Sequence, residues 1–278
     1  MKIGAHVSTA KPFSEAVKRA NEIGCECMQI FANPPQRWNP VPISNDEIKK
    51  FVELNKKYDI SPIIIHGIYL INLASDNPFF YKASAKSLID DMQKAEKLGA
   101  LGVNFHVGST KGKTFAEVLP KIKDAIVEIL SSSSEKVDLI LENSAGAGDI
   151  IGDTLEELGE IIKAVKSPRL KVLVDTAHAF ASGYDLRDEK GLKNFLQKFE
   201  EEIGLEKLVG FHFNDSKSAL NSNRDRHADI GYGEIGMKTF EMFTNHPKLK
   251  NLFCILETPE DNENWTKQIK KLKSMRKS

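Results

Sequence analysis

Six short apolar segments of this chain each end on a residue whose side chain can bind a metal ion. Each segment is aliphatic and rich in Ile, Val and Leu, which is typical of a buried β-strand. If these strands are parallel, their carboxyl ends meet on one face of the fold, and the terminal imidazoles and carboxylates converge on a single pocket. The six residues are His66, His106, Glu142, Asp175, His212 and Glu257.

Three further residues extend this set. His178 follows Asp175 by three positions, so the two side chains share a face if the chain turns into a helix there. Asp225 and His227 are two positions apart, so they point to the same side of an extended segment. The nine candidates include five of the seven histidines in the chain.

The residue types in this set indicate the chemistry that it supports. Several carboxylates buried together without cations would destabilise the fold, whereas divalent metal ions remove the repulsion. With about three or four ligands per ion, the set suits about two or three ions. Imidazole and carboxylate without thiolate favour zinc, manganese or iron, and open coordination positions favour catalysis. Such a cluster is suited to phosphodiester hydrolysis, because the ions lower the pKa of water and neutralise phosphate oxygens.

Helical segments separate the strand-like ones and indicate the order of the fold. Residues 13–23 have apolar side chains at helical spacing, and Ser44 followed by Glu47 predicts a reciprocal capping box at the next helix. Further helices are predicted at 83–98 and 265–272, and a long loop at 214–236. Eight alternating units predict an α/β (β/α)8 TIM barrel with its metal site at the C-terminal strand ends. A doubly wound open sheet is the alternative.

Composition is compatible with one barrel. No Gly/Ser-rich or Pro-rich tract divides the chain, so we expect a single domain over residues 1–278. The 39 basic and 39 acidic residues count against nucleic acid as a ligand unless a local basic face exists. Cys25, Cys27 and Cys254 form no CxxC pair, and we expect them in the core of a cytoplasmic protein. We find neither a secretory signal nor a membrane-spanning stretch, so we expect no membrane partner.

Longer motifs around the candidate ligands resemble those of a known family. They are GAHVS at 4–8, YLINL at 69–73, LENSAG at 141–146, DTAHAFASGY at 175–184, NDSK at 214–217, and DRH at 225–227 followed by GYG at 231–233. In these motifs, which occur in the family's order over nearly the whole chain, the protein resembles the endonuclease IV family of apurinic/apyrimidinic endonucleases.

The resemblance implies a (β/α)8 barrel that holds three zinc ions, with manganese or iron as the alternative at one position. It also makes Glu142 a catalytic residue, because this carboxylate would bridge two ions and help to place the attacking hydroxide. By the resemblance, His66, His106 and Glu142 hold the first ion, Glu142, Asp175, His212 and Glu257 the second, and His178, Asp225 and His227 the third.

The resemblance also implies an activity and a substrate. Family members cut the DNA backbone 5′ to an abasic site, leaving a 3′-hydroxyl and a 5′-deoxyribose phosphate, and they remove blocking groups from 3′ ends. We therefore expect double-stranded DNA with abasic sites or blocked 3′ ends as the partner. In a prokaryote this cytoplasmic protein would be associated with the nucleoid. No protein partner is implied, and we expect a monomer.

Loop residues beside the ligands are candidates for DNA contacts. Exposed at the end of the barrel, Tyr69 and Leu70 would wedge into the gap left by a missing base, and packing against the barrel rim is the alternative. Arg37 and Trp38 would enter the minor groove. Phosphate contacts are expected from Lys111, Lys113, Lys217, Arg224 and Arg226.

Some positions depart from the family pattern. Family members often carry a groove-probing arginine two residues before the tryptophan. That position aligns with Gln36, and Arg37 is displaced by one. Val107 replaces a proline that commonly follows the second ligand histidine. His6 matches a family residue that lies near the metals without binding them.

Two other functions compete with this interpretation. A sugar isomerase or epimerase on the same barrel would need only a two-metal core, without the third ligand set. A non-catalytic binder of damaged DNA would not need an intact ligand set.

Overall fold

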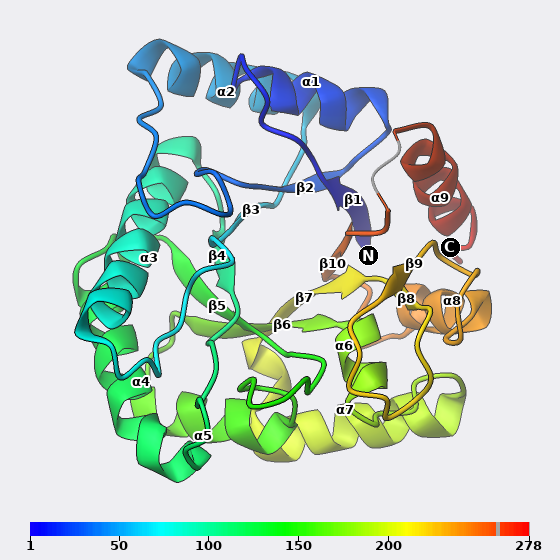
Figure 1. Cartoon of the computed structure of the whole chain (residues 1–278). Helices are drawn as coiled ribbons and strands as arrows, with labels where there is room; N and C mark the ends of the chain where they lie inside the picture. Colours follow the sequence, from blue (N-terminus) through cyan, green and yellow to red (C-terminus); the bar gives the residue numbers. More distant parts are fainter. Residues whose placement is uncertain (260–261, 278) are drawn as a thin grey trace.

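Eight parallel strands close into a barrel (Figure 1). In chain order they are β1 (Lys2–His6), β2 (Cys27–Ile30), β3 (Ile63–His66), β4 (Gly102–Phe105), β5 (Asp138–Glu142), β6 (Leu170–Asp175), β7 (Leu208–Phe213) and β10 (Phe253–Leu256). The computed structural model describes residues 1–259 and 262–277. Because β1 pairs with both β2 and β10, the sheet closes on itself. This confirms the predicted TIM barrel and excludes the open sheet.

Helices surround the barrel and connect its strands (Figure 1). They are α1 (Glu15–Glu22), α2 (Asn45–Tyr58), α3 (Pro78–Leu98), α4 (Phe115–Ser131), α5 (Leu155–Val165), α6 (Thr176–Ala181), α7 (Glu189–Glu202), α8 (Met237–Asn245) and α9 (Asn262–Ser274), with a short 3₁₀ turn η1 (Leu205–Lys207). α3 begins at Pro78 rather than at residue 83. Asn77 Oδ1 accepts a hydrogen bond from Phe79 N at 2.9 Å, and proline suits the first helical position.

The predicted start of α2 is confirmed, but its capping box is not reciprocal. Ser44 Oγ accepts a hydrogen bond from Glu47 N at 3.3 Å. The Glu47 carboxylate accepts a hydrogen bond from Ser14 N instead, at 2.9 Å. Since Ser14 immediately precedes α1, this motif ties two neighbouring helices together.

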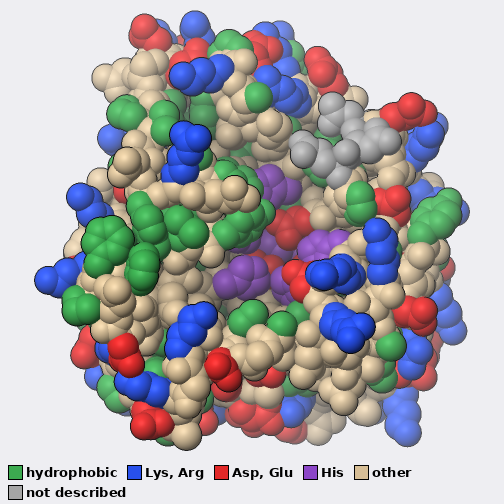
Figure 2. Space-filling model, in the orientation of Figure 1, with side chains coloured by type: hydrophobic (Ala, Val, Ile, Leu, Met, Phe, Trp, Pro, Cys, Tyr) green, Lys and Arg blue, Asp and Glu red, His purple; other side chains and the backbone are tan. Residues whose placement is uncertain are grey.

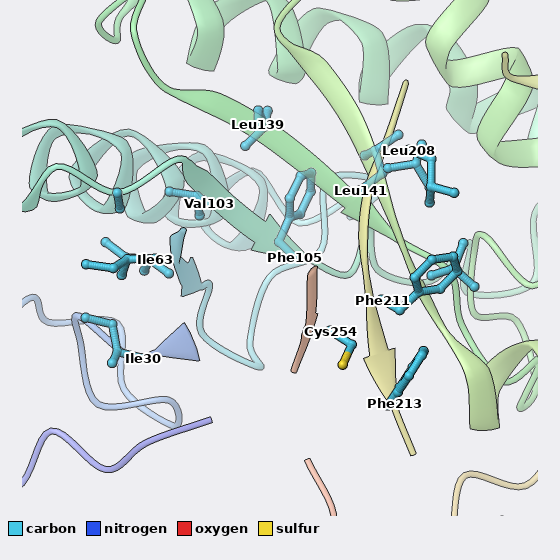
Figure 3. Packing of buried hydrophobic residues seen from close by; sticks show 14 of the residues in the cluster. Ile30, Ile63, Val103, Phe105, Leu139, Leu141, Leu208, Phe211, Phe213 and Cys254 are labelled. Atoms are coloured by element: carbon cyan, nitrogen blue, oxygen red, sulfur yellow. The ribbon is translucent and has the colours of Figure 1, made fainter. Parts of the chain in front are cut away.

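Strand side chains alternate between two separate hydrophobic clusters. The larger cluster packs the strands against the helices, and Figure 3 shows part of it, including Val103, Phe105 and Phe211. The smaller one fills the inside of the barrel. Because side chains two positions apart on a strand point the same way, the residue two positions beyond a member of the inner cluster also faces the interior. The inner cluster consists of Cys27, Ile64, Ile140, Leu173, Phe253 and Ile255.

Two expectations from composition can be compared with the structure. Cys25, Cys27 and Cys254 are buried and free, as predicted. In the part of the chain that the structure describes, no helix combines the length and the apolar character needed to cross a bilayer.

Candidate metal centre

The predicted ligands occupy the layer next to the inner cluster, at the C-terminal ends of the strands. On four strands a ligand lies two positions after a residue of that cluster, so the alternation of the strand turns both side chains into the barrel. The pairs are Ile64 and His66, Ile140 and Glu142, Leu173 and Asp175, and Ile255 and Glu257.

Glu142 is the centre of the arrangement and is fully buried. Its Oε2 atom lies 3.4 Å from His66 Nε2 and 3.7 Å from His106 Nε2. Its Oε1 atom lies 2.9 Å from His212 Nδ1 and 3.6 Å from His178 Nδ1. One carboxylate therefore faces four imidazoles, two on each oxygen.

His212 joins two more carboxylates to this centre. Its Nδ1 atom lies 3.1 Å from Glu257 Oε2 and 3.9 Å from Asp175 Oδ2. His212 and Asp175 are fully buried, and their strands, β7 and β6, are neighbours in the barrel.

The remaining ligands lie at the edge of the pocket. His178 is on α6, directly after β6, and its Nε2 atom lies 3.3 Å from Asp225 Oδ2. His227 Nε2 lies 3.1 Å from Asp225 Oδ1 and 3.7 Å from Asp175 Oδ2. Asp225 is the exposed member of this group.

Ligand atoms within 4.8 Å of one another form three groups. Two of them have the composition expected for the first and second ions. The third differs, because Asp175 joins His178 and His227, while Asp225 lies next to both imidazoles. The groups are His66, His106 and Glu142; Glu142, Asp175, His212 and Glu257; and Asp175, His178 and His227.

The donors fit divalent metal ions. His227 Nε2 is buried and has no hydrogen-bond partner among the described residues, although two carboxylates lie near it. A buried nitrogen without a hydrogen bond is costly unless it binds a cation, so this atom is suited to be a ligand. All three groups offer imidazole and carboxylate donors, the combination that zinc, manganese and iron accept.

The charges in the pocket are strongly coupled. Burial alone would raise the pKa of the Glu142 carboxyl, but the His212 and His106 imidazoles hold it well below its usual range. Burial opposes protonation of His212 and His227, yet neighbouring carboxylates raise the pKa of each imidazole to about 9. We therefore expect the His212 and His227 imidazoles to be protonated at neutral pH when no metal is bound.

Amide side chains that the sequence analysis did not select hold the carboxylates in place. Asn104 Nδ2 donates a hydrogen bond to Glu142 Oε2. Asn214 Nδ2 donates to Asp175 Oδ2 at 2.6 Å, and Asn214 Oδ1 accepts from Glu257 N at 2.9 Å. Both asparagines are fully buried. Strand alternation could have identified Asn104, because this residue lies two positions after inward-facing Gly102 on β4.

Gln29 and His6 both contact the carboxylate of Glu257. Gln29 Oε1 lies 2.8 Å from His212 Nε2, and Gln29 Nε2 donates a hydrogen bond to Glu257 Oε1. His6 Nδ1 lies 3.2 Å from the same Glu257 oxygen. His6 thus contacts the predicted ligand Glu257 and belongs to none of the three groups.

Comparison with known proteins decides the family. The chain matches the xylose isomerase-like TIM barrel family over residues 17–275. A Halothermothrix orenii protein named "Probable endonuclease 4" is 42% identical over 94% of this chain and 94% of its own length. The crystal structure of endonuclease IV from Thermus thermophilus is 31% identical, with a TM-score of 0.89 over 99% of this chain and 98% of that one. This chain belongs to the endonuclease IV family.

Two further proteins differ in how much they share with this chain. A Caenorhabditis elegans "Apurinic-apyrimidinic endonuclease" is 36% identical over 93% of this chain and 66% of its own length. A D-tagatose 3-epimerase-like protein is 23% identical, with a TM-score of 0.76 over 99% of this chain and 97% of that one. The epimerase comparison extends to the fold alone, whereas the endonuclease IV relatives match in sequence over nearly the whole chain.

As in other TIM barrels, the loops after the strands surround the centre. His227, a member of the third group, lies in the loop at 214–236. This segment is not the plain loop predicted from the sequence. Within it β8 (Asp215–Ser216) pairs antiparallel with β9 (His227–Ala228). The buried Asp215 carboxylate accepts hydrogen bonds from Gly231 N, Gly233 N and Ile235 N at 2.9–3.0 Å. Asp215 thereby fixes the loop that carries two of the predicted ligands, Asp225 and His227.

A cavity of about 1130 Å³ opens onto the metal centre, and Tyr69 lines it. Figure 2 shows histidines and carboxylates at the bottom of this hollow. Tyr69 is 61% exposed and Leu70 37% exposed, although the Tyr69 ring also contacts Phe31 and His66 at centroid distances of 5.4 and 5.8 Å. The loop is packed on the rim and still presents both side chains to solvent.

The other predicted DNA contacts differ in exposure and in their partners. Arg37, Lys217 and Arg226 are exposed, and Lys217 N donates a hydrogen bond to Arg226 O across the β8–β9 pair, at 2.8 Å. Trp38 is half-buried, because its ring stacks on Phe80. Lys113, one of the expected phosphate contacts, forms a 2.6 Å ion pair with Asp76 at the surface.

Proposed function

We propose that this chain is a DNA-repair endonuclease that hydrolyses the phosphodiester 5′ to abasic sites in duplex DNA. The products would be a 3′-hydroxyl and a 5′-deoxyribose phosphate, and the same centre would remove blocking groups from 3′ ends. Endonuclease IV family membership supports this proposal. The single observation that carries it is that three metal-capable groups meet around one buried carboxylate, Glu142, at the bottom of an open cavity.

The cofactor that we propose is a cluster of three zinc ions, with manganese or iron as the alternative at one position. Bound in this pocket, the ions lower the pKa of water and neutralise the phosphate and the leaving alkoxide. The ligands are the nine residues expected from the sequence, with Asp175 next to both the second and the third group. They are His66, His106, Glu142, Asp175, His178, His212, Asp225, His227 and Glu257.

The residues of the chain have distinct roles in this proposal. Glu142 carries negative charge between four imidazoles, and its low pKa keeps it ionised at neutral pH. Asn104 orients one of its oxygens, and Asn214 holds Asp175 and Glu257 at the other side of the pocket. These hydrogen bonds fix the donors before substrate binds, so less reorganisation is needed during the reaction.

Tyr69 and Leu70 are proposed to recognise the lesion by its shape. An abasic site lacks one stacked base, so a wedge enters there at a lower cost than in intact duplex, where a step must be unstacked. Their exposure beside the cavity supports this role. Contacts to the grooves and phosphates are proposed for Arg37, Trp38, Lys217 and Arg226.

We further propose that the chain acts as a single domain over residues 1–278 and as a monomer without a protein partner. Its location would be the cytoplasm, on the nucleoid in a prokaryote.

Incision of a defined duplex tests the function. A duplex with one abasic analogue should be nicked 5′ to the lesion, with a 3′ end that a polymerase can extend, and the undamaged duplex should stay intact. Metal analysis of the same protein should give three ions per chain. Intact abasic duplex after incubation with zinc-loaded protein would contradict the proposal, and one or two ions with sugar epimerisation would favour the rival enzyme.

A further inference from the structure

Exposed aromatic side chains gather on the first turn of α3, outside every motif that the metal centre uses. Phe79 is 63% exposed and Phe80 is 44% exposed. The Phe80 ring stacks on Trp38 at a centroid distance of 6.2 Å and meets Phe79 edge-on at 5.4 Å. Three rings from two separate segments thus form one surface.

This surface is continuous with the rim of the metal cavity. Trp38 belongs to the same loop as Pro35, and Pro35 O accepts a hydrogen bond from Tyr69 N at 2.9 Å. The Tyr69 ring in turn lies 5.8 Å from the His66 ring, measured between centroids. Figure 2 shows hydrophobic side chains gathered beside the hollow that exposes the histidines.

The two phenyl rings are not part of the core, whereas the half-buried Trp38 ring also packs against it. Asn77 caps the first turn of α3, so the backbone of Phe79 is fixed. The buried face of α3 begins further along, at Ser84, Ala85 and Leu88. Leaving two phenyl rings in water forgoes the stabilisation of burying them, and contiguous exposed apolar surface commonly marks a binding site.

We propose that Trp38, Phe79 and Phe80 form a platform on which unpaired bases of a DNA strand stack, beside the metal centre. Aromatic faces stack on any base, and cationic side chains follow the backbone in such sites. Arg37, next to Trp38, is exposed and has no ion pair in the parts of the chain described here, so its guanidinium is available to a phosphate. This proposal depends on the proposed function in one respect: it assumes that the ligand is DNA.

A second copy of the chain is the less suitable occupant. A stable protein interface buries roughly 800 Å² on each partner and involves about 20–30 residues. The platform consists of three rings bordered by a cation, which is narrow for a dimer and wide enough for one or two bases.

Two single strands of equal charge test the platform. One is an oligothymidylate about 15 nucleotides long, and the other is a chain of abasic units with the same number of phosphates. Binding is measured by fluorescence anisotropy at one salt concentration, in a Glu142→Gln background that keeps the strands intact. The variant is Phe79→Ser with Phe80→Ser, and its matched control is Val52→Ser with Val127→Ser, which changes similarly exposed side chains on α2 and α4.

The platform predicts a loss that depends on bases. The Phe variant should bind oligothymidylate about tenfold more weakly and the abasic chain unchanged. Phe79→Tyr with Phe80→Tyr should retain the parent's binding, and the Val control should match the parent. Equal losses for both strands, or no loss for either, would overturn the platform. A parent dimer that the Phe variant converts to a monomer in sedimentation would overturn it in favour of a second copy.

Failure of the platform can be distinguished from failure of the proposed function. Incision of an abasic duplex by the unmodified chain tests the function without reference to these rings. Base-dependent binding without incision would leave the platform standing and reject the nuclease, and incision without base-dependent binding would do the reverse.

Discussion

The metal centre is built on strand ends, whereas the surface proposed to contact DNA is built on loops and on one helical turn. Glu142 and His212 are fully buried and face other charged groups across a few ångströms. Tyr69 and Phe79 are mostly exposed, and each makes a backbone hydrogen bond and contacts neighbouring rings. If the proposed roles are correct, the barrel fixes the metal-binding side chains, and exposed side chains on the rim can be replaced without disturbing the barrel.

Removing the central carboxylate should have the largest effect. Glu142→Gln takes a negative charge from between four imidazoles and weakens two groups of ligands at once. Replacing residues that merely orient a metal ligand commonly costs about 10- to 100-fold, so we expect a fall in the rate of incision beyond about 100-fold. Asp138→Asn, at the other end of β5, should be nearly neutral. Turnover near the wild-type rate with full metal content would contradict the role of Glu142.

Breaking the loop that joins the two regions should have the next largest effect. Asp215→Asn places an amide N–H₂ group opposite backbone amides that now donate to a carboxylate. The loop that carries Asp225 and His227 should loosen, and we expect loss of one ion per chain and about 10- to 100-fold lower activity. Exposed Glu234→Gln in the same loop is the control. Three retained ions with a lower melting temperature would mean that Asp215 serves stability alone.

Changing the wedge tests the rim while leaving all nine proposed metal ligands in place. Tyr69→Ala with Leu70→Ala should lower the ratio of damaged-duplex to intact-duplex affinity by about tenfold, because the inserted side chains are gone. Metal content should not change. Val127→Ala, on the outer surface of α4, is the matched control. Both affinities must be measured at one salt concentration. An unchanged ratio together with a lower melting temperature would favour rim packing over lesion recognition.

The same comparison explains what the sequence could reveal. The ligands at strand ends could be predicted because alternation, parallel strands and barrel closure leave one place for them. Asn104 and Gln29 follow the same alternation. A pattern of imidazoles and carboxylates does not identify them, because both are amides. Asp175 belongs to two of the groups, and this depends on the turn from β6 into α6, which strand periodicity does not describe.

Local sequence patterns do not predict contacts between segments that are far apart in the chain. Asp215 accepts hydrogen bonds from amides 16 to 20 positions further along the chain, so its role depends on the path of the whole loop. Phe80 gains its role from Trp38, which belongs to the loop after β2. Lys113 forms its ion pair with Asp76, which lies in the loop between β3 and α3. In each case the partner is decided by tertiary structure.

Metal retention should depend on pH in a way that separates the pocket from the rim. In metal-free protein, carboxylates raise the pKa of His212 and His227 to about 9. The ion pairs of these protonated imidazoles stabilise the metal-free fold. Their contribution is complete below the pKa of histidine in the unfolded chain, about 6.5, and is lost as the pH rises through 9. Metal binding needs neutral imidazoles, so its contribution grows over the same range.

The difference in melting temperature between loaded and chelated protein should therefore widen from about pH 6.5 to 9, by roughly 2–4 °C per kcal/mol. Differential scanning fluorimetry measures it. His246→Asn, outside the three groups, should show the same widening. A constant difference would mean that these imidazoles are not protonated in the metal-free pocket.

Arg37 should give the smallest effect and show how the rim contributes. It is exposed and has no ion pair among the residues that the structure describes, and it lies one position after the place where family members often carry a groove-probing arginine. If it contacts a phosphate, Arg37→Ala should weaken damaged and intact duplex equally, by a few-fold, and should reduce the slope of log affinity against log salt by about one. Gln36→Ala, its uncharged neighbour, should leave that slope unchanged. A selective loss for damaged duplex at constant salt slope would instead mean that Arg37 probes the lesion from the minor groove. Two segments of the rim would then recognise the lesion: the loop that carries Tyr69 and Leu70, and the loop after β2 that carries Arg37.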